Sequence, residues 1–149
     1  MLHLASRSPR RRELLARLGV QFNVLDVDIP EVRGPLESPP AYVGRVAAEK
    51  AAAGAELVRD RDGAVVIGAD TEVVLDGTVF GKPQDAAQAR DMLGRLSGRV
   101  HQVLSAVAVR AGGRLLEALT ISDVEFAPLS AAQIAAYVKE NPLTALGIA

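Results

Sequence analysis

A chain of 149 residues with a formal net charge of −1 is long enough for one domain with a hydrophobic core and short for two. It contains no cysteine, which excludes disulfides, thiol catalysis and thiolate metal ligands. Balanced charge and few aromatic residues argue against a nucleic-acid-binding protein, because single-stranded binding uses aromatic stacking. Arginines interrupt the amino terminus where a signal peptide would be apolar, and no apolar run approaches the roughly 20 residues that span a membrane. We therefore expect a soluble, cytoplasmic protein.

The first residues predict a short strand followed by a helix. Leu2–Ala5 is an apolar run, while Ser8 and Pro9 are typical of the N-cap and the first position of a helix. Gly19 is expected to end this helix. The buried stripe of the helix would consist of Leu14, Leu15 and Leu18.

Three consecutive arginines, Arg10, Arg11 and Arg12, occupy the first turn of this helix, where the helix dipole repels them. Free backbone N–H groups, the dipole and the guanidinium groups together favour binding of an anion such as phosphate. The alternative is a solvated basic helix end in which the repulsion is tolerated.

Residues 28–35 predict an irregular loop because prolines occur there at high density. Mg²⁺ typically takes one or two carboxylates plus substrate phosphates, so one acid of this region could complete a cation site with Asp70. The acids are Asp26, Asp28, Glu31 and Glu37. A helix over 41–58 follows, with Lys50 on its apolar face. The spacing leaves open whether Lys50 turns to solvent or reaches into a cleft as a phosphate ligand.

Residues 65–69 predict a buried strand that ends at Asp70. Open α/β sheets bind ligands at the carboxyl ends of their strands, so a carboxylate there indicates a site. A second strand over 73–75 leads to the hairpin signal Asp76-Gly77. The return strand, 78–80, is followed by Lys82, which the turn would bring back towards Asp70. The plain alternative is a hairpin with two solvated charges.

The remaining chain predicts a helix over 85–96 and two strands, 100–109 and 115–126, around Gly112-Gly113. Ser130 is expected to begin a last helix that reaches Lys139, whereas 141–149 gives no clear element. The alternation of strands and helices predicts an α/β fold with a mixed, twisted sheet flanked by helices. We expect a basic active-site cleft between residues 6–11 and 70–82.

Several segments together closely resemble the Maf family of nucleoside triphosphate pyrophosphatases, which are similar in fold to the inosine triphosphate pyrophosphatases. The match follows the family's order over nearly the whole chain, up to Val138. The segments are Ala5-Ser6-x-Ser8-Pro9-Arg10-Arg11-x-Glu13-Leu14-Leu15, Tyr42-Val43-x-Arg45-Val46-Ala47-x-Glu49-Lys50-Ala51, Gly68-Ala69-Asp70-Thr71, Gly81-Lys82-Pro83 and Leu96-Ser97-Gly98-Arg99-x-His101-x-Val103.

The resemblance implies a hydrolase that uses a divalent cation, Mg²⁺ or Mn²⁺, and cleaves nucleoside triphosphates between the α- and β-phosphates. Asp70 matches the proton acceptor, and Glu31 an acid beside the metal. The substrate-handling positions of the family match Ser8, Arg11, Lys50 and Lys82 for the phosphates, and Arg10 and Thr71 for the base.

Ala69-Asp70-Thr71 resembles the dTTP/UTP branch, whereas the 7-methyl-GTP branch more often shows Ser-Asp-Gln. Family members usually continue for roughly 40 residues beyond this point, so we expect 1–149 to form a single Maf-like domain that lacks the usual C-terminal part. Three alternatives stay open: a nucleotide-binding regulator without catalysis, a pyrophosphatase of the 7-methyl-GTP branch and a nucleic-acid-associated protein. The first two fit better, since no stable nucleic-acid or membrane partner is expected; a homodimer is compatible with the resemblance.

Overall fold

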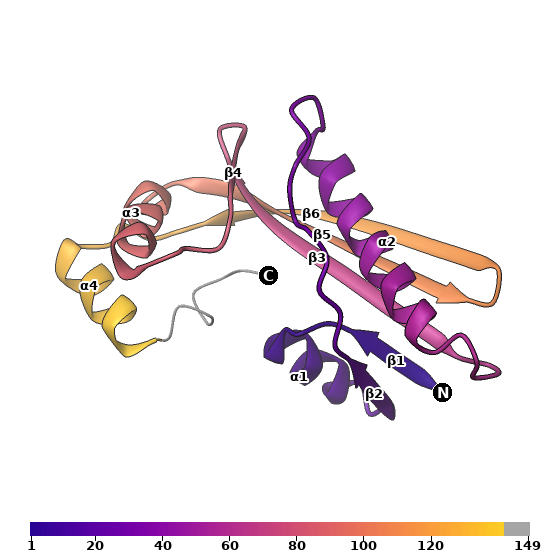
Figure 1. Cartoon of the computed structure of the whole chain (residues 1–149). Helices are drawn as coiled ribbons and strands as arrows, with labels where there is room; N and C mark the ends of the chain where they lie inside the picture. The colour runs from indigo at the N-terminus through magenta and orange to yellow at the C-terminus, as the bar shows by residue number, and fades with distance from the viewer. Residues whose placement is uncertain (142–149) are drawn as a thin grey trace. The chain divides into compact units, whose positions relative to one another are not determined.

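The computed structural model describes residues 1–141, which form six strands and four helices (Figure 1). The sheet order is β2-β1-β3-β5-β6, and β4 pairs with β3 alone. Because β1 runs parallel to β2 and β3 while β4 runs antiparallel to β3, the sheet is mixed and the predicted α/β class is confirmed. In chain order the elements are β1 (Leu2–Ala5), α1 (Pro9–Arg17), β2 (Phe22–Leu25), α2 (Pro39–Leu57), β3 (Val65–Leu75), β4 (Thr78–Phe80), α3 (Ala86–Leu96), β5 (Val100–Ala111), β6 (Arg114–Glu125) and α4 (Ala131–Glu140).

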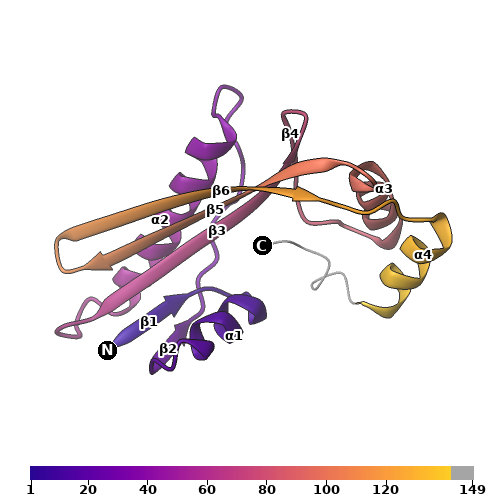
Figure 2. The same ribbon diagram turned by 180° about the vertical axis from the view of Figure 1, so that it is seen from behind.

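The chain forms two compact units. The first contains Met1–Asp70 and Ser105–Thr120, and the second contains Thr71–Leu104 and Ile121–Ala149. Strands β3, β5 and β6 each contribute residues to both units. Figure 2 shows the same strands from behind. None of the helices in residues 1–141 is long and apolar enough to cross a membrane.

The first unit is built on close packing between α2 and the strands β1 and β3. Its core contains Ala5, Val58 and Val66, all almost fully buried. At Gly68 the strand passes directly against the helix: a Cβ there would lie 2.4 Å from the carbonyl oxygen of Ala47 and 2.5 Å from the backbone nitrogen of Ala51. This contact fixes the height of β3 along α2 just before Asp70.

The second unit contains the predicted hairpin and the helix pair α3 and α4. Asp76 and Gly77 have φ angles of 49° and 78°, the left-handed conformation of a type I′ turn, which confirms the turn expected from Asp-Gly. The side chains of Asp85 and Ser130 cap α3 and α4, as their positions in the sequence predict. Figure 1 shows α3 and α4 packed together.

Two expectations are wrong. The strand that begins at Val65 does not end at Asp70 but continues to Leu75. Its pairing with β1 ends at Gly68 and its pairing with β4 begins at Val73, and β5 is a further hydrogen-bonded neighbour of β3. The leucine stripe of α1 is not buried: Leu14 is 49% and Leu18 73% exposed. Spacing marks an apolar face, but burial needs a second element against it, and no residue of α1 is buried. Nearly all of the segment 141–149 lies outside the described residues.

Candidate active site

Parallel pairing of β1 with β3 creates the edge at which the candidate site lies. Ala5, the last residue of β1, pairs with Gly68, so the chain leaves β1 beside the segment of β3 that carries Asp70. The helix α1 begins directly afterwards, and the Ser8 hydroxyl accepts a hydrogen bond from the Arg11 backbone N–H at 3.3 Å. Even though β3 continues, the site therefore occurs at the carboxyl end of a neighbouring parallel strand, as open α/β sheets favour.

Asp70 is the buried acid of this site. It is 1% exposed, and its Oδ1 accepts a hydrogen bond from Lys50 Nζ at 3.4 Å. Its Oδ2 is buried without a hydrogen-bond partner. Burial raises the pKa of Asp70 and Glu31 raises it further, while Lys50 and Arg11 oppose this rise. A carboxylate with a raised pKa and an unpartnered oxygen suits a general base.

Lys50 links the buried acid to the loop that precedes α2. Its Nζ lies 2.6 Å from Glu31 Oε1 and 3.4 Å from Asp70 Oδ1, and its side chain is only 12% exposed. Of the two orientations that spacing left open, the structure therefore has Lys50 directed inwards, between two carboxylates. Its predicted contact with phosphate stays a prediction.

Of the four acids considered for a cation site with Asp70, Glu31 is the one that forms an ion pair with Lys50, which also pairs with Asp70. The other three acids pair elsewhere: Asp26 and Asp28 with Arg7, and Glu37 with Arg45.

The donor set of Glu31 and Asp70 fits a hard divalent cation. Both are carboxylates, and the unpartnered Oδ2 of Asp70 offers a buried anionic oxygen. Within residues 1–141, no group of three or more His, Asp or Glu side chains could hold a metal ion. Substrate phosphates would therefore have to complete the coordination, which is how Mg²⁺ commonly binds in phosphate-handling sites.

The other predicted residues divide between the two units. Ser8, Arg10 and Arg11 belong to the first unit with Asp70, and the charge of Arg11 acts on Asp70, whereas Arg10 is exposed. Thr71, although it follows Asp70 directly, and Lys82 belong to the second unit. The predicted roles of these residues, and the cleft expected between 6–11 and 70–82, stay predictions.

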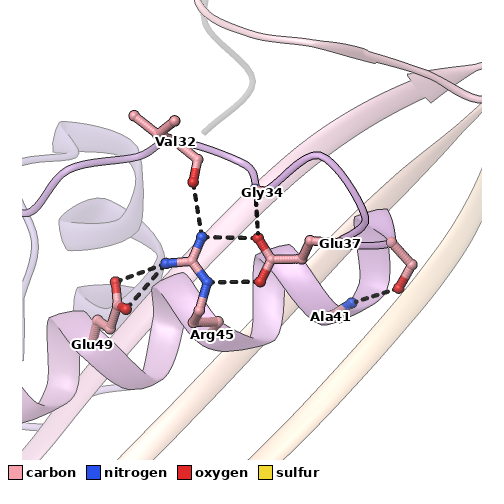
Figure 3. A network of polar contacts seen from close by, with 7 residues as sticks. Val32, Gly34, Glu37, Ala41, Arg45 and Glu49 are labelled. Atoms are coloured by element: carbon pink, nitrogen blue, oxygen red, sulfur yellow. Dashed lines mark hydrogen bonds and ion pairs between the residues drawn. The ribbon is translucent and has the colours of Figure 1, made fainter.

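Sequence reasoning did not single out Arg45, whose guanidinium makes five hydrogen bonds around the Glu31 loop (Figure 3). Its spacing to Glu49, four residues later on α2, was a readable signal for one pair. The contacts with Glu37 and Val32 depend on the path of an irregular loop, which no local pattern specifies.

A buried acid, a second carboxylate, a lysine between them and an arginine-rich helix N-terminus define a site suited to phosphate chemistry. The pattern of the family described as Maf-like protein matches residues 1–147, and the chain belongs to the Maf family. It is 58% identical over 139 residues to a nucleoside triphosphate pyrophosphatase of Xylella fastidiosa, with 93% of this chain and 74% of that protein covered. It is also 57% identical over 139 residues to a dTTP/UTP pyrophosphatase of Xanthomonas campestris, with 92% and 73% covered.

A solved structure supports the fold. The Ham1 protein of Staphylococcus aureus matches with a TM-score of 0.52 at 14% identity, covering 83% of this chain and 70% of that one.

Proposed function

We propose that this chain hydrolyses nucleoside triphosphates to a nucleoside monophosphate and pyrophosphate. Membership of the Maf family and relatives above 55% identity that carry this activity in their names support the proposal. The observation that carries it is the arrangement within the first unit: Asp70, buried with one unpartnered oxygen, lies with Lys50 and Glu31, under the charge of Arg11 from the N-terminus of α1.

The first unit supplies the cationic groups that a triphosphate needs. The N-terminus of α1 provides the positive end of the helix dipole, which favours an anion such as phosphate. Arg11 and Lys50 add two charges from different elements, and the Ser8 hydroxyl lies at the same helix end. Binding across these groups would align the α-phosphate with Asp70, and alignment of reacting groups is worth several kcal/mol of the barrier.

Asp70 acts as the base in the proposed reaction. Its carboxylate accepts a proton from a water molecule whose oxygen forms a bond to the α-phosphorus. The bond from the α-phosphorus to the oxygen that bridges to the β-phosphorus breaks, and pyrophosphate leaves with that electron pair. Lys50 and Arg11 offset the negative charge of the phosphates. Mg²⁺ or Mn²⁺, held by Glu31 and Asp70, would shield the phosphates and lower the pKa of water.

Pyrimidine triphosphates are the proposed substrates, with 7-methyl-GTP as the competing choice. The support is the name dTTP/UTP pyrophosphatase carried by the Xanthomonas relatives, together with Thr71 directly after Asp70. Arg10 and Thr71 are the residues proposed to distinguish the base. A nucleotide-hydrolysing enzyme of this kind is expected in the cytoplasm and without a stable nucleic-acid partner, and a homodimer is compatible with the proposal.

The test is a panel of dTTP, UTP, CTP, GTP and 7-methyl-GTP with Mg²⁺ or Mn²⁺, assayed for pyrophosphate and orthophosphate. Reaction in ¹⁸O-water locates the bond that forms: attack on the α-phosphorus places the label in the nucleoside monophosphate alone. We expect pyrophosphate release, label in the monophosphate, and dTTP and UTP as the best substrates. Orthophosphate release, or label in pyrophosphate, contradicts the reaction; tight binding without turnover supports the regulator instead. Equal rates with all bases refute the branch assignment alone.

A further inference from the structure

Glu31 stands on a segment without regular structure, so other groups must fix its position. Residues 26–38 join β2 to α2 and contain neither helix nor strand. At the start of this loop, Arg7 pairs with Asp26 and Asp28, but these side chains are all more than half exposed. Exposed ion pairs of this kind contribute little to holding a backbone. The proposed metal ligand therefore needs a firmer attachment on its other side.

Arg45 provides that attachment from α2 (Figure 3). Its Nε and Nη2 donate to the two carboxylate oxygens of Glu37 at 2.7 and 2.9 Å, and Nη2 also donates to the Val32 carbonyl at 2.9 Å. Its Nη1 donates to both oxygens of Glu49 at 3.0 and 3.2 Å. Glu37 in turn accepts from the Gly34 N–H at 3.1 Å. These contacts join the loop backbone to the helix.

The two ends of this network lie next to the two partners in the site. Val32 directly follows Glu31 in the loop, and Glu49 directly precedes Lys50 on α2. Glu31 and Lys50 form an ion pair at 2.6 Å. We infer that Arg45, together with Glu37, positions Glu31 against Lys50 and so keeps the two-carboxylate cation site assembled. This inference rests on the proposed function, and Arg45 acts in it as a positioning residue without touching substrate.

The chemistry of the clamp, Arg45 with Glu37, requires arginine. A guanidinium has five N–H donors in a fixed planar fork, and Arg45 makes five hydrogen bonds. Lysine carries the same charge on a single nitrogen with three donors, so it cannot reproduce five hydrogen bonds from a planar fork. Arg45 also lies over the Tyr42 ring, 5.5 Å from its centroid, a further contact that favours a guanidinium. Arg45→Lys therefore keeps the charge and removes the geometry.

Cleavage by trypsin after Arg33 reports directly on the loop, since Arg33 is exposed and lies beside Val32 and Gly34. We expect Arg45→Lys to speed this cleavage roughly tenfold, the size expected from losing hydrogen bonds to charged groups, with an unchanged cooperative melt. Arg17→Lys is the matched control, because Arg17 forms one exposed pair with Glu13 on α1 and keeps a tryptic site. The control should cleave at the parental rate.

Metal dependence of pyrophosphate release reports on the site. Arg45→Lys should raise the Mn²⁺ concentration for half-maximal activity severalfold, while turnover at saturating Mn²⁺ stays within about twofold of the parent. The decisive comparison is a double-mutant cycle with Glu31→Gln. If Arg45 acts through Glu31, Arg45→Lys should not shift the Mn²⁺ midpoint further in the Glu31→Gln background. The Arg17→Lys control should leave the midpoint unchanged in both backgrounds.

The outcomes separate the clamp from the function that it serves. Unchanged cleavage after Arg33, or additive shifts of the Mn²⁺ midpoint in the double mutant, would overturn the positioning role in an active enzyme. A parent chain that releases no pyrophosphate would overturn the proposed function and the catalytic meaning of the clamp with it. Faster cleavage with a midpoint shift that disappears in the Glu31→Gln background supports the inference.

Discussion

Replacing Gly68 by alanine tests how the site is built, because this glycine lets β3 lie against the backbone of α2. An added Cβ would lie 2.4 Å from the Ala47 carbonyl oxygen and 2.5 Å from the Ala51 nitrogen, whereas ordinary contact begins at 3.4 Å. Both neighbours are backbone atoms, so no side-chain rotation can relieve the clash. Strand and helix would have to separate by about 1 Å, the difference between these distances.

The cost follows from that displacement. Overpacking a well-packed core typically costs about 1–3 kcal/mol, and a clash with helix backbone belongs at the upper end. At about 2–4 °C per kcal/mol for a chain of this size, a loss of about 3 kcal/mol lowers the melting temperature by about 6–12 °C. Asp70 lies two residues from Gly68 and Lys50 is on the displaced helix. Since a misplacement of about 1 Å can cost about 100-fold in rate, activity at 25 °C should fall by a similar factor.

Thermal unfolding and pyrophosphate release of the purified variants are the measurements. Gly44→Ala is the control, since it lies on the same helix and an added Cβ there meets nothing within 4 Å. Alanine in a helix interior is favoured over glycine by roughly 0.5–1 kcal/mol, so this control should melt slightly higher and stay active. A Gly68→Ala variant that melts within about 2 °C of the parent, less than 1 kcal/mol on this scale, would refute the packing argument.

Three further predictions concern charge. Burial and nearby cations lower the pKa of His3. The parent should therefore lose stability as pH falls below about 6.5, by at most about 1.4 kcal/mol per pH unit. Urea titrations of His3→Leu should show a smaller dependence of stability on pH. Hydrogen bonds from Arg45 and Gly34 lower the pKa of Glu37 to about 2. The stabilisation that ionised Glu37 contributes is therefore present above its unfolded pKa near 4.5 and is lost as pH falls from there towards 2. Glu37→Gln should melt at a lower temperature than the parent at pH 7 and lose less stability over that acid range. Arg11→Ala should raise KM for the triphosphate roughly tenfold with little change in melting temperature. The control Arg17→Ala, on the same helix, should leave KM unchanged. A lower melting temperature with an unchanged KM would mean that Arg11 is structural.

Local signals in the sequence predicted the elements of the fold. The sequence predicts Ser8, Asp85 and Ser130 as N-caps. Each of these side chains accepts a hydrogen bond from the backbone N–H of the third residue of its helix. Asp76-Gly77 predicts its turn because few other residue pairs adopt two positive φ angles. The exposure of the leucine face of α1 was not predictable, because the spacing of leucines does not show whether another element packs against them.

The candidate site was predictable only in part. The type and approximate location of Asp70 followed from the apolar run before it, but its place inside β3 depends on pairing with strands that are distant in the sequence. The inward direction of Lys50 depends on Glu31 and Asp70, which are 19 and 20 residues away in sequence. The contacts of Arg45 with the loop could not be predicted, because they depend on the path of an irregular segment that has no periodic pattern in the sequence.

Single-turnover pyrophosphate release by Asp70→Asn tests the central claim most directly. Asparagine keeps the shape of the side chain and removes its negative charge, and burial of that charge is unfavourable, so the variant should unfold cooperatively at the parental temperature or slightly higher. Asp26→Asn is the matched control, since Asp26 is an exposed acid of the same unit. At saturating metal and dTTP, the account predicts a rate lower by about 10²–10⁴-fold for Asp70→Asn and an unchanged rate for Asp26→Asn. An Asp70→Asn enzyme that keeps more than about a tenth of the parental rate, far short of that loss, would show that Asp70 is not the base.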